Sequence, residues 1–168
     1  MTKPHGFYLL IWGIFVSDVN AECSNLLSQI TPNEQFEIAA DNVVIDKVNK
    51  LMWMRCSLGQ QTIDESCTGN ASKLKWLDAL NQAQRLNFAG FSDWRLPNKN
   101  ELNTIVELSC HMPAVNIKVF PLTGSVNFWT SSPYDDAESH LWAINFSNGN
   151  IFAIEASQAI AVRLVRDL

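Results

Sequence analysis

Four cysteines constrain the fold of this chain more than any other feature, because an even number allows the whole set to be cross-linked. Cys23, Cys56, Cys67 and Cys110 all follow an apolar segment near the N-terminus. None of them forms the close C-x-x-C pair that is typical of a structural zinc site. We therefore expect two disulfide bonds, drawn from three possible pairings.

The N-terminus predicts export to an oxidising compartment. The apolar run FYLLIWGIFV covers residues 7–16 and is followed by small residues that suit a signal-peptidase site before Glu22. Its ten residues are about half of what spans a bilayer, which argues against a permanent membrane anchor. The alternative is a buried N-terminal strand. We predict a cleaved signal peptide over residues 1–21, a single domain over residues 22–168, and a secreted or periplasmic location.

The pairing of the cysteines follows from the segment SLGQQTIDES, which lies between Cys56 and Cys67. This segment is polar and lacks apolar periodicity, so it needs a cross-link to hold a shape. Closing a loop of this size contributes about 3 kcal/mol in the chain-entropy model. We therefore predict a Cys56–Cys67 bond and, by elimination, a Cys23–Cys110 bond. The neighbouring His111 is expected at the surface and not as a metal ligand.

Composition and charge indicate a single globular domain and argue against nucleic acid as its partner. The chain has 168 residues, of which 47% are apolar and 17% charged, as in one globular domain. The net charge is −5, and lysine and arginine form no cluster. Nucleic acid is not expected as a partner, because its phosphates call for a basic surface.

Hydrophobic patterning predicts two helices between two groups of strands. Alternation in residues 42–56, with a turn at Asn49–Lys50, predicts two short strands. In residues 71–88 the near-helical spacing of four small or apolar residues predicts an amphipathic helix. These four are Leu74, Leu77, Leu80 and Ala83.

A capping box of Asn98 and Glu101 predicts that a second helix begins directly after Pro97. Leu102, Ile105, Val106 and Ser109 then lie at helical spacing. The runs beyond Pro113 are β-rich, and Ser147-Asn148-Gly149 predicts a hairpin turn between two of them.

The connector DWRLP, residues 93–97, is predicted to be an extended link between the helices, since a residue before proline avoids the helical region. Trp94 and Leu96 then face one side, and Asp93 and Arg95 face the other. Arg95 could bind an anionic ligand or pair with a carboxylate such as Asp93 or Glu101, and we favour the structural role. The residues predicted to build the structural core are Trp53, Trp94, Arg95, Trp129 and Trp142.

The blocks LMWMRCSLGQ, SCTGNA, FAGFSDWRLPNKNEL, NFWTSSPY, WAINFSNGN and VRLVR together resemble the Lcl C-terminal domain family, from about Val43 to Arg166. The resemblance implies an exported bacterial domain. It also implies an α+β, C-type lectin-like fold with two helices packed on small twisted antiparallel sheets, and with long loops. A cysteine pair common in the family matches Cys56 and Cys67. The family's implied role is adhesion through surface glycans, including sulfated ones.

The chain departs from this family pattern in three respects. It has no collagen-like G-x-y tract, and its acidic balance lacks the basic field that sulfated polysaccharides favour. It also lacks the Glu-Pro-Asn and Trp-Asn-Asp motifs by which lectins of this fold hold calcium. The sequence therefore predicts neither a metal nor another cofactor.

Catalytic motifs are not apparent in the sequence. The two histidines of the predicted mature chain, His111 and His140, belong to no nucleophile or metal motif. Asp135 and Asp136 are adjacent, and adjacent side chains on an extended chain point apart, which does not suit paired-carboxylate chemistry. The sequence therefore predicts a protein that is not an enzyme.

The polar loop SSPYDDAESH, residues 131–140, is the predicted ligand-binding segment, through Tyr134, Asp135, Asp136 and His140. A ring flanked by carboxylates suits a sugar, because C–H-rich sugar faces stack on rings and acids accept hydroxyl hydrogens. Alternatively, Tyr134 covers the edge of a sheet. The first functional hypothesis is recognition of a glycan or surface polymer. The second is a structural or protein-binding role in an envelope or surface assembly.

Overall fold

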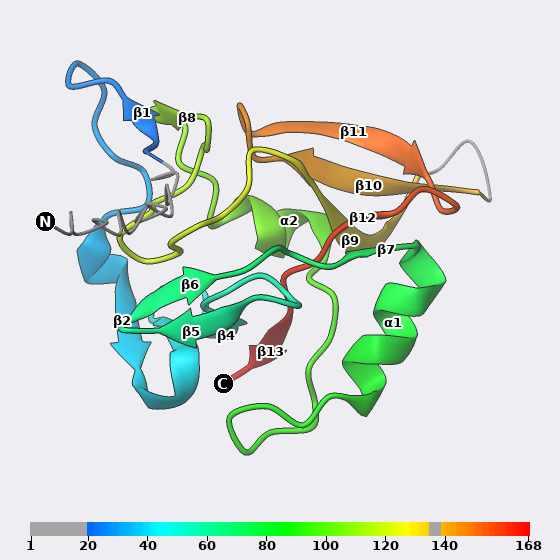
Figure 1. The fold of residues 1–168 in the computed structure, drawn as a ribbon. Helices are drawn as coiled ribbons and strands as arrows, with labels where there is room; N and C mark the ends of the chain where they lie inside the picture. Colours follow the sequence, from blue (N-terminus) through cyan, green and yellow to red (C-terminus); the bar gives the residue numbers. More distant parts are fainter. Residues whose placement is uncertain (1–19, 135–138) are drawn as a thin grey trace, which may run out of the picture.

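The computed structural model describes residues 20–134 and 139–168, which form a mixed α+β fold with several small sheets and few helices (Figure 1). The predicted signal peptide lies almost entirely outside the described residues and stays a prediction. A five-stranded sheet has the order β11-β10-β9-β12-β7, and a four-stranded sheet has the order β13-β4-β3-β2. Neighbouring strands are antiparallel except for β12 and β9, which are parallel.

The strands of the larger sheet are β7 (Lys73–Leu74), β9 (Asn127–Pro133), β10 (His140–Asn145), β11 (Asn150–Glu155) and β12 (Ile160–Ala161). Those of the smaller one are β2 (Phe36–Ala39), β3 (Val43–Asp46), β4 (Leu51–Met54) and β13 (Val165–Asp167). Two-stranded sheets pair β1 (Glu22–Cys23) with β8 (Cys110–His111), and β5 (Gln61–Ile63) with β6 (Ser66–Thr68). The helices are η1 (Asn33–Gln35), η2 (Ala40–Asn42), α1 (Trp76–Arg85) and α2 (Lys99–Asn103).

Both predicted hairpins form. The turn between β3 and β4 is held by buried Asp46, whose carboxylate accepts hydrogen bonds from the backbone of Val48 and Asn49. The turn between β10 and β11 contains Gly149 at φ +79°, where a Cβ would meet Val106 Cγ1 at 2.7 Å. This turn therefore requires glycine for its backbone conformation and for the close approach.

The helix α1 forms where predicted, but its buried face differs from the predicted one. Leu74 belongs to β7, and Leu77 is 63% exposed. The buried residues of α1 are Ala79 and Ala83. Because the helix begins only at Trp76, the inward stripe follows Trp76, Ala79 and Ala83, and Leu77 points to solvent.

The helix α2 begins with the predicted capping box but is shorter than predicted. The Asn98 side chain accepts from the Glu101 backbone N–H, and the Glu101 carboxylate accepts from the Asn98 backbone N–H. The helix ends at Asn103, and Val106 instead forms a β-bridge with Val115. Ile105 and Val106 are thus buried from an irregular turn, whereas Leu108 is exposed.

Both disulfides join the cysteines that the sequence pairs. Cys23 bonds to Cys110, its cross-strand neighbour in the β1–β8 sheet, and Cys56 bonds to Cys67. Their presence fits an oxidising compartment outside the cytoplasm. None of the helices in residues 20–134 and 139–168 is long and apolar enough to cross a membrane.

The segment between Cys56 and Cys67 contains structure that the sequence did not predict. It folds into the β5–β6 hairpin, whose two-residue turn at Asp64–Glu65 has positive φ at both positions. Positive φ at two successive residues is the geometry of a type I′ hairpin turn, which usually takes asparagine, aspartate or glycine. The turn thus lacks the glycine that would have revealed the hairpin.

The core consists of two apolar clusters, and both larger sheets lie between them. Phe128 and Trp129 are neighbours on β9 but belong to different clusters, as do Met52 and Trp53 on β4. This follows from strand geometry, because successive side chains point to opposite faces. Both faces of each sheet are therefore covered along part of their length.

The connector between the helices is extended, with Trp94 and Leu96 buried. The Trp94 Nε1 donates to the Phe88 carbonyl at 3.0 Å. Arg95 is half-buried and uses its guanidinium on two carboxylates, those of Glu101 at 2.8 and 3.0 Å and Asp167 at 2.6 Å. Arg95 thus ties α2 to the C-terminal strand β13, which matches the structural role that we favoured.

Candidate functional site

The predicted binding loop joins β9 to β10 at one end of the larger sheet. Tyr134 directly follows β9, and its backbone N–H donates to the carbonyl of His140, the first residue of β10, at 3.0 Å. The His140 Nδ1 lies 3.1 Å from the Ser139 hydroxyl. Asp135 and Asp136 lie outside the described residues, so their part in a site stays a prediction.

The ring of Tyr134 packs edge-to-face on the indole of Trp142, with centroids 4.8 Å apart. Trp142 was predicted to be a core residue, but it is only half-buried. Its cross-strand neighbour on β11 is Ala153, which is too small to cover an indole. Trp129, by contrast, is fully buried and donates its Nε1 to the Leu74 carbonyl. Tyr134 of the predicted site and Trp142, which was not part of it, thus form a pair of half-buried rings at this end of the sheet.

A lysine completes this arrangement. The Nζ of Lys99, the first residue of α2, lies 4.5 Å from the centroid of the Trp142 ring, within the range of a cation–π contact. The Lys99 backbone N–H donates to the Ser132 hydroxyl at 2.9 Å, which ties α2 to β9. We call Tyr134, Trp142 and Lys99 the aromatic platform. A sugar could stack a C–H face on the rings while the ammonium donates to its hydroxyls.

The sequence did not indicate Lys99 or the surface role of Trp142. Lys99 is separated from Tyr134 by 35 positions, and only the docking of α2 against β9 and β10 brings them together. The alternating pattern of β10 places the Trp142 side chain on one face of the sheet. It does not reveal which residue of the neighbouring strand lies beside Trp142, and this residue is Ala153.

Two other side chains that could face a ligand, those of His111 and Arg166, have partners within the protein. His111 Nε2 lies 2.9 Å from a carboxylate oxygen of Glu22, across the β1–β8 sheet. Arg166 pairs with Asp93 and lies over the ring of Phe91. Within the described residues, three or more His, Cys, Asp and Glu side chains do not gather anywhere in an arrangement that could hold a metal ion.

A buried carboxylate holds the N-terminal segment. Glu107 accepts hydrogen bonds from the backbone of Ile30 and from the backbone and hydroxyl groups of Thr31 and Ser109, at 2.7–3.3 Å. Burial alone would raise the pKa of the Glu107 carboxyl, but the hydrogen bonds from Ser109 and Thr31 outweigh it and lower that pKa from 4.5 to about 2. Glu107 thus favours the charged form in the folded protein.

A buried cation lies in the other half of the fold. The Arg163 guanidinium donates to the carbonyls of Met54 and Arg55 and to the hydroxyls of Ser57 and Thr123. Its Nε has no hydrogen-bond partner among residues 20–134 and 139–168. Burial lowers the pKa of Arg163 to about 9, so the group is still protonated at neutral pH.

The fold and these contacts define a small α+β domain, cross-linked by disulfides, whose buried charges are structural and whose loop site is aromatic. Comparison with protein families then identifies the family of this domain. The family model of the Lcl C-terminal domain matches residues 42–166, which is most of the chain, so this chain belongs to that family. The match covers both helices α1 and α2, the Cys56–Cys67 bond and the aromatic platform. No curated protein matches the chain.

Proposed function

We propose that this domain is a non-enzymatic recognition module, exported from the cytoplasm, that binds a glycan or surface polymer through the aromatic platform. The observation that carries the proposal is the half-buried indole of Trp142, which is flanked by the Tyr134 ring at 4.8 Å and by the Lys99 ammonium at 4.5 Å. A tryptophan kept partly open between a ring and a cation costs hydrophobic burial, which a ligand stacked on it would recover.

The C-type lectin-like fold implied by the family resemblance is part of this proposal. In support, two short helices pack beside small sheets, and the candidate site lies on a loop that joins two strands. Carbohydrate binding of this kind would need no calcium, because the rings would stack on the sugar and the Lys99 ammonium would donate hydrogen bonds to its hydroxyls. An adhesive role is also part of this proposal, because a domain that binds a glycan on a cell surface attaches to that surface.

A glycan array probed with the oxidised domain of residues 22–168 tests the proposal. We expect reproducible hits that free glycan competes away and that Tyr134→Ala abolishes. Phe152→Ala is the matched control, because Phe152 is also a partly exposed aromatic residue on this sheet but lies on β11, outside the platform. Thermal melting of both variants establishes that they are folded. A blank array, or equal loss in both variants, would overturn the proposal.

The second candidate function is binding of an envelope protein, and the free edge of β11 favours it. This strand ends the larger sheet and exposes Ile151 and Phe152. A partner could add a strand to such an edge. If pull-downs from envelope extract return a stoichiometric protein that Phe152→Lys releases while the array stays blank, this function replaces the first.

A further inference from the structure

A cavity of about 510 Å³ opens at one end of the smaller sheet, where η2 joins β2 to β3. Three segments of the chain meet there, namely β2 with η2, the residue after β4, and the turn between β5 and β6. We call it the Arg55 cavity. The residues that form its walls are Ile38, Ala39, Ala40, Asn42, Arg55 and Glu65.

The register of the smaller sheet places the side chains of Ile38 and Arg55 on the same face. Ile38 pairs with Val44, and Val44 pairs with Trp53, so these three side chains lie on one face. The Arg55 backbone N–H donates to the Asn42 carbonyl at 2.9 Å, which continues the ladder of β3 and β4 by one step. Because Arg55 lies two residues beyond Trp53, its side chain belongs to that face as well.

Arg55 is a buried cation that leaves most of its donors unused. The residue is only 8% exposed, and its Nε donates to the Val119 carbonyl at 3.3 Å. Its two Nη nitrogens carry four further N–H groups, which have no acceptor among the groups that the structure describes. Unlike the Nε of Arg163, these nitrogens are not fully enclosed by the protein. A molecule in the cavity can therefore accept hydrogen bonds from them.

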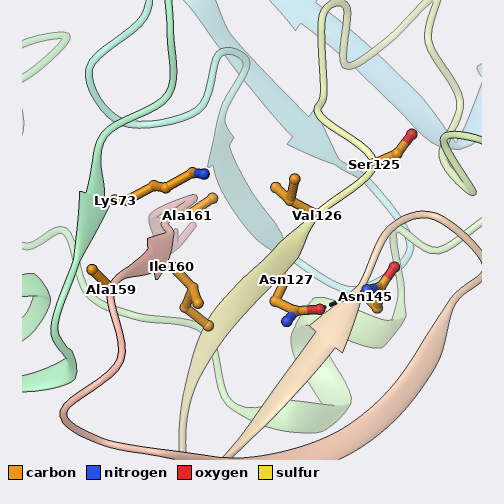
Figure 2. Close-up of a pocket in the computed structure, with 8 residues that line it drawn as sticks. All are labelled: Lys73, Ser125, Val126, Asn127, Asn145, Ala159, Ile160 and Ala161. Carbon is orange, nitrogen blue, oxygen red and sulfur yellow. Dashed lines mark hydrogen bonds between the residues drawn. The ribbon is translucent and has the colours of Figure 1, made fainter.

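Burial distinguishes Arg55 from the cation at another cavity. Lys73 borders the opening beside β12, but it is exposed (Figure 2). Water hydrates an exposed ammonium, which therefore needs no ligand. The Arg55 guanidinium has lost most of its hydration, and an anion bound in the cavity would replace the missing hydrogen bonds.

The chemistry of the walls indicates which anion fits. A guanidinium presents N–H groups in a planar fork that matches the two oxygens of a carboxylate. The side-chain amide of Asn42 borders the same cavity and adds a neutral donor. Glu65 brings a carboxylate to the rim, and it forms no ion pair with any residue that the structure describes. This carboxylate repels a doubly charged anion and attracts an ammonium, so the walls suit a ligand that carries both charges.

We propose that the Arg55 cavity binds an α-amino acid with a small aliphatic side chain, in its zwitterionic form. The ligand carboxylate accepts from the Arg55 Nη groups, its ammonium donates to Glu65, and its side chain lies against Ile38 and Ala40. The proposal goes beyond glycan recognition and does not depend on it. The cavity borders the smaller sheet, whereas the aromatic platform lies at the larger one.

The test is an NMR titration of the ¹⁵N-labelled, oxidised domain of residues 22–168 with racemic alanine at neutral pH. We expect shifts of the backbone amide signals of Asn42 and Arg55 and of the Asn42 side-chain amide. Propionate lacks the ammonium and alaninamide lacks the carboxylate, so each should bind at least about tenfold more weakly than alanine. Equal affinity for propionate overturns the contact with Glu65, and equal affinity for alaninamide overturns the contact with Arg55. Absence of any shift with alanine overturns the whole proposal.

Arg55→Lys tests the cation, because an ammonium keeps the charge but loses the planar fork. We expect alanine binding to weaken about tenfold, with thermal melting to establish that the variant is folded. Unchanged affinity in the folded variant would contradict the assignment of the carboxylate to Arg55.

Glu65→Gln provides a second test that leaves the buried residues intact, since Glu65 is exposed. It should weaken alanine binding about fivefold or more and leave propionate binding unchanged, because only alanine carries an ammonium. Asp64→Asn is the matched control, since Asp64 is the other residue of the same turn and does not line the cavity. Equal alanine affinities of the two variants would overturn the proposal. Tyr134→Ala should leave alanine binding unchanged, so the failure of either proposal is distinguishable from the failure of the other.

Discussion

Glu107 and Arg163 are both charged and buried, and neither has an ion-pair partner among the described residues. Glu107 receives hydrogen bonds at both carboxylate oxygens, and its pKa falls to about 2 because the folded protein prefers the anion. Arg163 gives hydrogen bonds to four groups, but its Nε finds no acceptor in the part of the chain that the structure describes, and its pKa falls to about 9 because burial disfavours the cation. The comparison teaches that the balance differs between the two buried charges: at Glu107 the hydrogen bonds to both oxygens outweigh burial, whereas at Arg163 burial outweighs the hydrogen bonds that its guanidinium donates.

The two sites also connect different parts of the chain. Glu107 fastens the segment at Ile30 and Thr31 to the turn after α2, close to the Cys23–Cys110 bond. Arg163 fastens the end of β4 to the loop that contains Thr123. Each charge thus binds backbone groups of irregular segments and, in the case of Met54, of the last residue of a strand.

The largest expected effect is that of Arg163→Met. The substitution leaves two carbonyls and two hydroxyls in the core without their donor, so we expect a loss of about 4 kcal/mol in the free energy of unfolding. Urea denaturation of the oxidised domain measures it. Arg163→Lys should lose less, since an ammonium keeps the charge but reaches fewer acceptors. If both variants are as stable as the wild type, Arg163 is not a structural link.

Glu107→Gln should have the next largest effect, about 3 kcal/mol at neutral pH, because the folded protein lowers the pKa of this carboxyl from 4.5 to about 2. The sign follows from that direction: the contribution is complete above pH 4.5 and is lost as the pH falls toward 2. Stability measured against pH should therefore decline in this window for the wild type more than for the variant. Parallel curves for the two proteins would contradict the assignment.

A smaller effect should appear as coupling between Glu107 and the nearby disulfide. Both hold the N-terminal segment, so Glu107→Gln should cost about 1 kcal/mol less when Cys23 and Cys110 are both replaced by serine. A double-mutant cycle from urea denaturation measures this difference. The matched cycle with Cys56 and Cys67 should show no coupling, because that bond lies away from Glu107. Equal coupling in both cycles would mean that the disulfides act on the whole fold.

The smallest effect is expected at the surface, where Arg166 pairs with Asp93 at 2.8 Å. The hydrogen bond from Arg166 lowers the pKa of the Asp93 carboxyl, but solvent screens this exposed pair. Asp93→Asn should lower the melting temperature by at most about 2 °C, and high salt should remove the difference. A larger, salt-independent loss would place this pair with the buried charges.

Local signals in the sequence were sufficient for the β3–β4 and β10–β11 turns, the capping box, the connector and the cysteine pairs, but not for the β5–β6 hairpin. Each depends on residues close together or on a small number of combinations, as with Asn98 and Glu101. The lengths of the helices were not predictable in the same way. The helix α2 ends early because Val106 bridges to Val115, a contact that depends on the tertiary fold.

The candidate site was predictable only in part, for the same physical reason. Tyr134 stands out in a polar loop, whereas the exposure of Trp142 depends on a small neighbour in the next strand. The placement of Lys99 depends on how α2 docks.

The disulfide connectivity has a consequence for how the protein matures. The Cys56–Cys67 bond lies, in sequence, inside the span closed by Cys23 and Cys110. A polypeptide that enters an oxidising compartment N-terminus first, as the predicted signal peptide implies, exposes Cys23 and Cys56 before their native partners arrive. Oxidation in order of arrival would join those two wrongly. We therefore expect the native pairing to form in higher yield in an oxidising compartment that contains a thiol-disulfide isomerase able to correct the first linkage.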